Sequence, residues 1–197
     1  MTLTIHTLGD SHAYTGWSTL DIPSVTIITH WLGPKLMHSF NRDGFDLRTL
    51  SLRQDDFVIF CFGEIDVRCH IHNWVRDDFH STIDTLISDY FSRISKCVSE
   101  LTGIFVKVGV YFIPPAAKKE TSNENKEYPF SGTDDERKMY VTYMNQQMRD
   151  KCNQYGFIFF DLFDAYCDDG FLKREMSDGH VHIKNTQPLI DFIRSLQ

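Results

Sequence analysis

The sequence lacks any long apolar run, and it is short of positive charge. No stretch of about 18 apolar residues occurs, so no segment is expected to cross a bilayer as a helix. The N-terminus has no positively charged region ahead of an apolar one, which predicts a cytoplasmic protein without a signal peptide. Lys and Arg number 20 against 27 Asp and Glu, and the net charge of -7 argues against nucleic acid or an anionic membrane as a partner.

Paired cysteines and nucleotide-binding motifs are also missing. The five cysteines are odd in number and none forms a C-x-x-C motif, which favours free thiols in a reducing compartment. The segment CHIHN at 69–73 contains Cys and His side chains that can bind metal, but its spacing matches no common zinc motif. No G-x-G-x-x-G or P-loop motif follows an apolar run. We therefore expect neither a metal nor another cofactor.

What the sequence does contain is a regular series of strand-like segments. Its 42% hydrophobic and 14% aromatic content indicates one folded domain over residues 1–197. Several of the apolar and β-branched runs are apolar on both faces, as buried strands are. The runs predict strands at 3–8, 25–29, 57–62, 104–112 and 157–163.

Helical periodicity separates the later strands. Apolar residues within 83–101 recur every three or four positions and predict a helix that stops at Gly103. A second helix is predicted between Thr133 and Gly156, because acidic residues at its start suit the positive end of a helix, and a short third one at 187–196. Strands that alternate with helices predict an α/β three-layer sandwich around a five-stranded parallel sheet.

A long polar segment, 116–133, lies between the fourth predicted strand and the helix that begins near Thr133. It is too long for an ordinary connection in such a domain. We predict that it forms a lid or an insertion loop.

Polar residues collect where the predicted strands end. In an open parallel sheet, ligands bind beyond the C-terminal ends of the strands. The loop GEIDVRCH at 63–70 carries Glu64, Asp66, Arg68 and His70 in alternation. Two interpretations stay open: a salt-bridged cluster that pins the loop, or an arginine held by a carboxylate and presented to a substrate oxygen.

A second polar cluster, SDGHVHI at 177–183, lies just before the last predicted helix. A serine hydroxyl becomes a nucleophile when a base takes its proton and an acceptor orients that base. Ser11, in the Gly-Asp-Ser turn after the first strand, could be that nucleophile, with His182 as base and Asp178 as its acceptor. His180 is an alternative base.

In their order along the chain, LGDSHA, FGEIDVR and SDGHVHI together resemble motifs of the SGNH (GDSL-like) hydrolase superfamily. The resemblance implies a flavodoxin-like SGNH hydrolase fold with Ser11 as nucleophile, His182 as base and Asp178 as its orienter. It also implies an oxyanion held by the Ser11 N–H, by a glycine and by an asparagine. Gly33 is the candidate glycine, with Gly44 behind it.

Two departures from the family pattern bear on the chemistry. Ile65 stands where the asparagine is expected, and an apolar side chain cannot donate a hydrogen bond to an oxyanion. Either another group donates instead, or turnover is slow, or the site does no acyl chemistry. The candidates for that group are Arg68, His70 and Asn73. The second departure is that Asp178 lies four residues before His182 instead of three.

These considerations define three sets of site residues. The catalytic set is Ser11, His182 and Asp178. The set expected to bind the oxyanion or the substrate is Gly33, Gly63, Arg68 and His70. The supporting set is Asp10, Glu64 and Asp66.

The function implied by the resemblance is that of a serine esterase acting on a small acyl ester. An O-acetylated carbohydrate or another glycan ester is the expected substrate, and Trp17 or Trp31 could stack on a sugar ring. Two alternatives stay open: an acyltransferase that passes the acyl group to a sugar from the same serine, and a non-catalytic carbohydrate-binding module that keeps the fold. The sequence does not indicate an oligomeric state.

Overall fold

A computed structural model describes residues 3–122 and 125–197 and shows one five-stranded sheet. The strand order is β2-β1-β3-β4-β5, and every neighbouring pair is parallel. The strands are β1 (Leu3–Gly9), β2 (Val25–Trp31), β3 (Phe57–Cys61), β4 (Lys107–Tyr111) and β5 (Ile158–Phe160). The predicted five-stranded parallel sheet is confirmed. The fifth strand is shorter than predicted, because the chain turns into the short helix α5 at Phe163.

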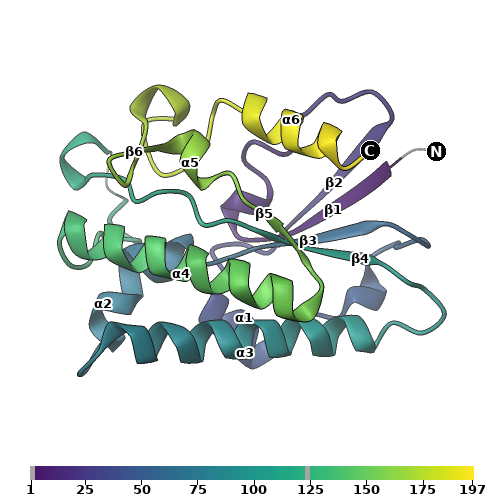
Figure 1. Cartoon of the computed structure of the whole chain (residues 1–197), viewed down its shortest axis with the longest axis horizontal. Helices are drawn as coiled ribbons and strands as arrows, with labels where there is room; N and C mark the ends of the chain where they lie inside the picture. The colour runs from purple at the N-terminus through teal and green to yellow at the C-terminus, as the bar shows by residue number, and fades with distance from the viewer. Residues whose placement is uncertain (1–2, 123–124) are drawn as a thin grey trace.

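Helices cover both faces of the sheet, which confirms the three-layer α/β sandwich. Figure 1 shows α1, α3 and α4 below the sheet and α6 above it. The helices are α1 (Met37–Asp43), α2 (Ile71–Trp74), α3 (Phe79–Ser99), α4 (Asp134–Tyr155), α5 (Phe163–Tyr166) and α6 (Gln187–Ser195). Side chains alternate along a strand, so β3 sends Val58 and Phe60 to one core and Phe57 and Ile59 to the other.

Local capping explains where the two long helices begin. Asp78 precedes α3 and accepts hydrogen bonds from the N–H groups of His80 and Ser81. Thr133 and Glu136 form a reciprocal capping box at the start of α4. At the other end of α4, Gly156 adopts the left-handed conformation, as predicted. The helix α3 ends at Ser99, a few residues before the predicted stop, and a turn follows.

Several short elements have no clear counterpart in the sequence pattern. The loop after β3 forms one turn of π-helix, η3 (Asp66–His70). A two-stranded hairpin joins β6 (Cys167–Asp168) to β7 (Phe171–Leu172). The single 3-10 turns are η1 (Ser11–Ala13), η2 (Leu47–Thr49), η4 (Lys119–Thr121) and η5 (Arg174–Met176). Elements this short depend on tertiary contacts more than on local periodicity.

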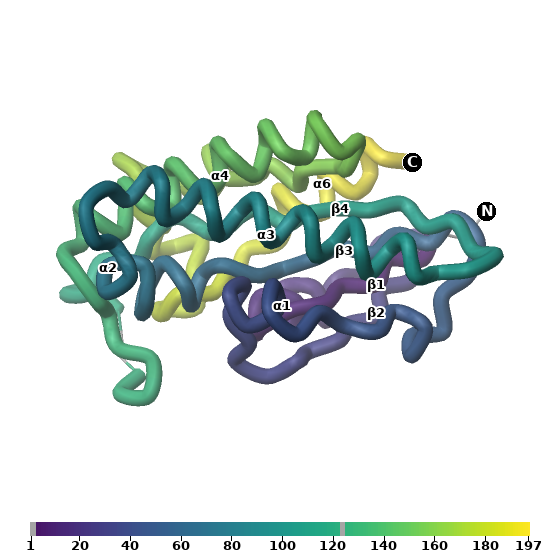
Figure 2. Tube along the Cα trace, turned by 90° about the horizontal axis from the view of Figure 1, so that it is seen from below, coloured from purple at the N-terminus to yellow at the C-terminus, as the bar shows by residue number. Residues whose placement is uncertain are grey.

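Figure 2 shows a loop from the described part of the segment 116–133, predicted to be a lid or insertion loop, projecting from one end of the molecule. Residues 123 and 124 lie outside the described part of the chain. Ala116 at one end forms a bridge with Phe171, and the N–H of Ser131 near the other end donates to the carbonyl of Arg68. The described ends of the segment are therefore anchored to the domain, and its role as a lid stays a prediction.

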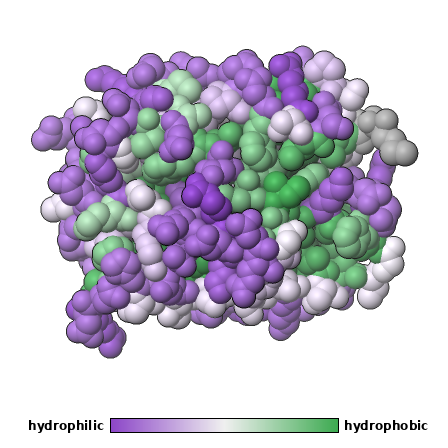
Figure 3. Space-filling model, in the orientation of Figure 1, coloured by the Kyte–Doolittle hydropathy of each residue, from purple (hydrophilic) through white to green (hydrophobic). Residues whose placement is uncertain are grey.

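The edge strand β5 is short, and apolar surface gathers around it. Figure 3 shows green surface near the centre of the face seen in Figure 1, where β5 lies, and polar side chains over most of the rest. A short edge strand offers few unpaired backbone groups to another chain.

Within the described residues, no helix combines the length and the apolar character needed to cross a membrane.

Close packing explains why the Gly-Asp-Ser turn begins with glycine. Gly9 ends β1 beside β3, and a Cβ atom at this position would lie 1.9 Å from the carbonyl oxygen of Cys61. Backbone cannot move aside as a flexible side chain can, so only glycine fits. This close approach lets β1 end level with β3 and places the turn at the edge of the sheet.

We therefore expect Gly9→Ala to lower the free energy of unfolding by about 2 kcal/mol or more, because the new methyl group must separate β1 from β3. Gly103→Ala is the matched control: it introduces strain at φ +75 but meets no atom within 4 Å. Urea unfolding followed by tryptophan fluorescence measures both variants. An equal loss in the two would contradict the packing explanation.

Candidate active site

Ser11, His182 and Asp178 come from opposite ends of the chain and meet beyond the C-terminal end of β1. Ser11 is the first residue of η1, and the other two lie in the loop before α6. The Nε2 atom of His182 lies 2.9 Å from Ser11 Oγ, and its Nδ1 atom lies 2.9 Å from Asp178 Oδ2. The structure thus brings the three predicted catalytic residues into one hydrogen-bonded relay.

A tight turn accommodates the four-residue separation between Asp178 and His182. Asp178 Oδ1 accepts hydrogen bonds from the backbone N–H groups of His180, at 2.8 Å, and His182, at 3.3 Å. The N–H of Asp178 in turn donates to the carbonyl of His182 at 3.0 Å. Because these bonds fold the loop back on itself, both side chains reach the same point.

The electrostatics of the relay suit a neutral base. Burial and the positive charge of His12 lower the pKa of His182 below its ordinary value, although the Asp178 carboxylate opposes this shift. Burial would raise the pKa of Asp178, but hydrogen bonds from the ring of His182 and from backbone N–H groups bring it below its ordinary value. An ionised carboxylate can only accept, so the proton of His182 resides on Nδ1 and the lone pair on Nε2 faces Ser11.

A pocket of about 420 Å³ opens over Ser11. Trp31, Pro34 and Ile65 contribute to its lining, and Tyr128 and Phe130 add two side chains from the segment 116–133. His180 and His182 also line it. The insertion segment therefore forms part of the pocket wall.

The predicted oxyanion and substrate residues separate into two groups. Arg68 lines the pocket, whereas Gly33, Gly63 and His70 are not among its lining residues. Gly33 adjoins Pro34, which does line it. Gly63 has a packing role, since a Cβ atom there would lie 2.6 Å from Ile113 Cδ1. The ring of His70 stacks on another side chain, that of Trp74, with centroids 5.4 Å apart.

The remaining donor candidates lie elsewhere. Asn73 donates to the carbonyl of Cys69 and to Ser131 Oγ, and Gly44 packs against Arg93 at the end of α1. Ile65, at the position where the family has asparagine, is 4% exposed and presents an apolar side chain to the pocket. The first N–H of a helical turn has no partner within that turn, so the Ser11 N–H is available to a ligand.

Glu64 and Arg68 form a buried ion pair that also holds the insertion segment. Arg68 donates from Nε to Glu64 Oε1 at 2.7 Å and from Nη2 to Glu64 Oε2 at 3.0 Å. Its Nη1 donates to the carbonyl of Tyr128. Burial would raise the pKa of Glu64, but the charge and hydrogen bonds of Arg68 bring it below its ordinary value. The pair therefore pins the loop, as the first interpretation predicts, and Arg68 borders the pocket, while its presentation to a substrate oxygen stays a prediction.

Asp66, predicted as a supporting residue, caps the start of α1. The residue before this helix, Leu36, supplies no side-chain cap. Asp66 is fully buried and accepts hydrogen bonds from the N–H of Met37 at 2.7 Å and of His38 at 3.1 Å. Burial raises the pKa of Asp66 to about 7, even though these hydrogen bonds oppose the shift. Asp66 thus joins the loop after β3 to the start of α1.

His12 is a site residue that the sequence interpretation did not include. Its backbone N–H and its ring Nδ1 both contact Asp10 Oδ1, at 2.8 and 3.0 Å, and its Nε2 lies 3.2 Å from the carbonyl of Val181. Its ring centroid lies 4.9 Å from that of His182. The only local signal was the Asp-x-His spacing around Ser11, because the contact with Val181 spans 169 positions.

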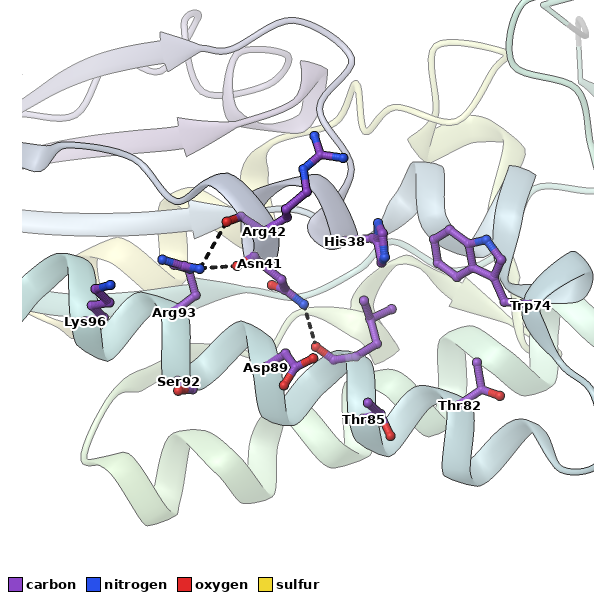
Figure 4. Close-up of a pocket in the computed structure, with 11 residues that line it drawn as sticks. His38, Asn41, Arg42, Trp74, Thr82, Thr85, Asp89, Ser92, Arg93 and Lys96 are labelled. Atoms are coloured by element: carbon purple, nitrogen blue, oxygen red, sulfur yellow. Dashed lines mark hydrogen bonds between the residues drawn. The ribbon is translucent and has the colours of Figure 1, made fainter.

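A larger groove of about 640 Å³ lies between α1 and α3 (Figure 4). Arg93 lies along it and donates to the backbone carbonyls of Asn41 and Arg42, which ties the two helices together. His38 and Trp74 close one end. Among the described residues, no hydroxyl group in its lining is hydrogen-bonded to His38 or to a carboxylate, so we place the chemistry at the smaller pocket over Ser11.

Comparison with known proteins identifies the fold. No protein-family model and no curated protein sequence matches the chain. Solved structures do, among them an aryl esterase from M. smegmatis with a TM-score of 0.65 and 15% identity over 100% of both chains. A carbohydrate acetylesterase from Sinorhizobium meliloti has a TM-score of 0.58 and 16% identity, covering 99% of this chain and 96% of that one. A GDSL-like lipase from Bacteroides thetaiotaomicron has a TM-score of 0.61 and 14% identity, covering 98% of this chain and 86% of that one. The chain has the fold of the GDSL-type (SGNH) hydrolases.

Asp66 should make stability depend on pH. Its folded pKa of about 7 lies above the ordinary value, so the folded state binds a proton that the unfolded state releases. The stabilisation by this proton is complete below about pH 4 and is lost as pH rises to about 7. The free energy of unfolding lost over this range is on the order of 4 kcal/mol at most.

Asp66→Asn should remove this pH-dependent stabilisation. The difference in unfolding free energy, wild type minus variant, should therefore fall between about pH 4 and pH 7. Urea titrations at several pH values measure the difference, with the exposed Asp150→Asn as control. Parallel pH profiles for wild type and Asp66→Asn would rule out the assignment.

Proposed function

We propose that the chain is a serine esterase of the SGNH type, which hydrolyses a small acyl ester through an acyl-enzyme on Ser11. The observation that carries the proposal is the relay from Asp178 through His182 to Ser11, with both steps at 2.9 Å, at the edge of a pocket. The fold supports it, because solved structures with this fold include esterases.

Each member of the relay has a role in this mechanism. As Ser11 Oγ attacks the ester carbonyl, His182 Nε2 takes the hydroxyl proton, and Asp178 stabilises the resulting imidazolium. The same Nε2–H then protonates the departing alkoxide, which leaves the acyl group on Ser11. Water repeats the sequence in the second half: His182 takes its proton, hydroxide adds to the acyl carbon, and the proton returns to Ser11 as the acid leaves.

We propose that the Ser11 N–H and Arg68 stabilise the oxyanion. Of the three side chains considered as a substitute for the absent asparagine, Arg68 alone lines the pocket. Glu64 and Tyr128 engage three of its five N–H groups, so two have no acceptor among the described residues. The loss of one donor typically costs about 10²–10³ in rate, so a guanidinium at this position matters for turnover.

An O-acetylated carbohydrate is the proposed substrate. Trp31 is 60% exposed and borders the pocket, so its ring is available to stack on a sugar. Trp17, the other candidate, is fully buried against Tyr111 and Phe160 and cannot reach a ligand. A carbohydrate acetylesterase is among the structures with this fold.

The esterase proposal predicts that Ser11→Ala and His182→Ala lower kcat/KM for p-nitrophenyl acetate by about 10³-fold or more, because each removes one member of the relay. Asp178→Asn should lower it by a similar order, because an amide no longer selects the Nδ1–H tautomer. His80→Ala is the control, since His80 lies on α3 and pairs with Asp78. Initial rates of p-nitrophenol release measure all four variants.

A fluorophosphonate probe separates the alternatives. Stoichiometric labelling of wild type, absent in Ser11→Ala, is expected for an activated serine. Equal background rates in all variants together with no serine adduct would overturn the esterase proposal. Sugar binding that persists without any adduct would instead favour the non-catalytic module. Ester cleavage that requires a sugar acceptor would favour the acyltransferase.

The substrate proposal predicts a selective effect of Trp31→Ala. Loss of a stacking platform should lower kcat/KM for an O-acetylated oligosaccharide by about tenfold, with little change for p-nitrophenyl acetate, which has no sugar ring to stack. Trp74→Phe, in the groove between α1 and α3, is the matched control and should alter neither activity. Equal losses on both substrates would contradict the platform role.

A further inference from the structure

A buried histidine lies directly behind the proposed base. His12 is 5% exposed, and its ring centroid lies 4.9 Å from that of His182, tilted by 40°. The mechanism proposed above makes no use of this residue. Its two ring nitrogens nevertheless have specific partners, one in the turn that carries Ser11 and one in the loop that carries His182.

The two partners determine the charge of His12. Its Nδ1 faces the carboxylate of Asp10, and its Nε2 faces the carbonyl of Val181. Both partners can only accept, and a neutral imidazole has a single N–H, so both contacts are hydrogen bonds only if the ring is an imidazolium. Burial would lower the pKa of His12, but the Asp10 carboxylate, with smaller contributions from Glu64 and Val181, raises it to about 9.

We infer that His12 is a positioning residue: the Asp10–His12 pair holds the loop that carries His182 and keeps a fixed positive charge against the ring of His182. The inference deepens the esterase proposal and rests on it. The bond to the Val181 carbonyl sets the position of the residue next to the base. The charge disfavours a second proton on His182. The base therefore stays neutral, and can accept the serine proton, down to a lower pH.

Charged groups from three segments face the two rings. His182 faces Asp178 from its own loop, His12 from η1 and Glu64 from the loop after β3. His12 faces Asp10 from its own turn, as well as Glu64 and His182. Both carboxylates near His182 favour its protonated form. The charge of His12 opposes them, and Arg68 is paired with Glu64. Removing the charge of His12 therefore raises the pKa of His182.

His12→Gln tests this inference, because glutamine keeps a hydrogen-bond donor but has no charge. NMR titration of the imidazole C2–H signals reports each histidine directly, and the His12 and His182 variants assign the two resonances. We expect the midpoint of His182 to move up by about one pH unit or more in His12→Gln. At about pH 6, kcat/KM should then fall severalfold, and by more at lower pH, whereas at about pH 9 it should change by less than about twofold. His80→Gln is the control.

Two outcomes would overturn the inference. One is a wild-type His12 signal that titrates below about pH 7, which needs no variant and so does not depend on folding. The other is an unchanged His182 midpoint in folded His12→Gln, with a rate loss that is the same at every pH, as a purely structural role predicts. Fluorophosphonate labelling of wild type keeps the two proposals apart. If Ser11 is not labelled, the esterase proposal fails while the NMR titration still decides the role of His12.

Discussion

The hydrogen bond between Ser11 Oγ and His182 Nε2 joins two residues that are 171 positions apart. It forms because β1 carries Ser11 to the C-terminal edge of the sheet, and the loop before α6 returns the chain to the same edge. Gly9 permits the close approach of β1 to β3, and the turn around Asp178 aims the ring of His182. The sheet, the turn and the loop are all needed for this one contact.

Charge pairing holds the loops around that contact in place. The Asp10–His12 and Glu64–Arg68 pairs are buried beside the relay, and each bonds to the backbone of another segment. Buried charges are tolerated when they are paired and hydrogen-bonded, and breaking such a pair leaves a charge without a partner. The pairs therefore act as fixed links between the turn after β1, the loop after β3, the insertion segment and the loop before α6.

The residue pattern was enough to predict the sheet and the long helices, because apolar runs and capping signals are local properties. The three residues that it singled out, Ser11, His182 and Asp178, do meet in the structure, and their catalytic role stays a prediction. The direction of a side chain is not local. Gly63 and His70 have suitable chemistry for the site, yet they pack elsewhere, and Trp17 is in the core. His12 could not be found this way, because its role depends on contacts made after folding.

The formation of an acyl-enzyme on Ser11 is the central claim, and rapid-quench mass spectrometry tests it most directly. The protein is mixed with p-nitrophenyl acetate, quenched in acid within the first turnover and digested. The account predicts an acetyl group on the peptide that contains Ser11, with an initial burst of p-nitrophenol equal to the enzyme present. Continued turnover with no acetyl group on Ser11, or with the group on another residue, would contradict it.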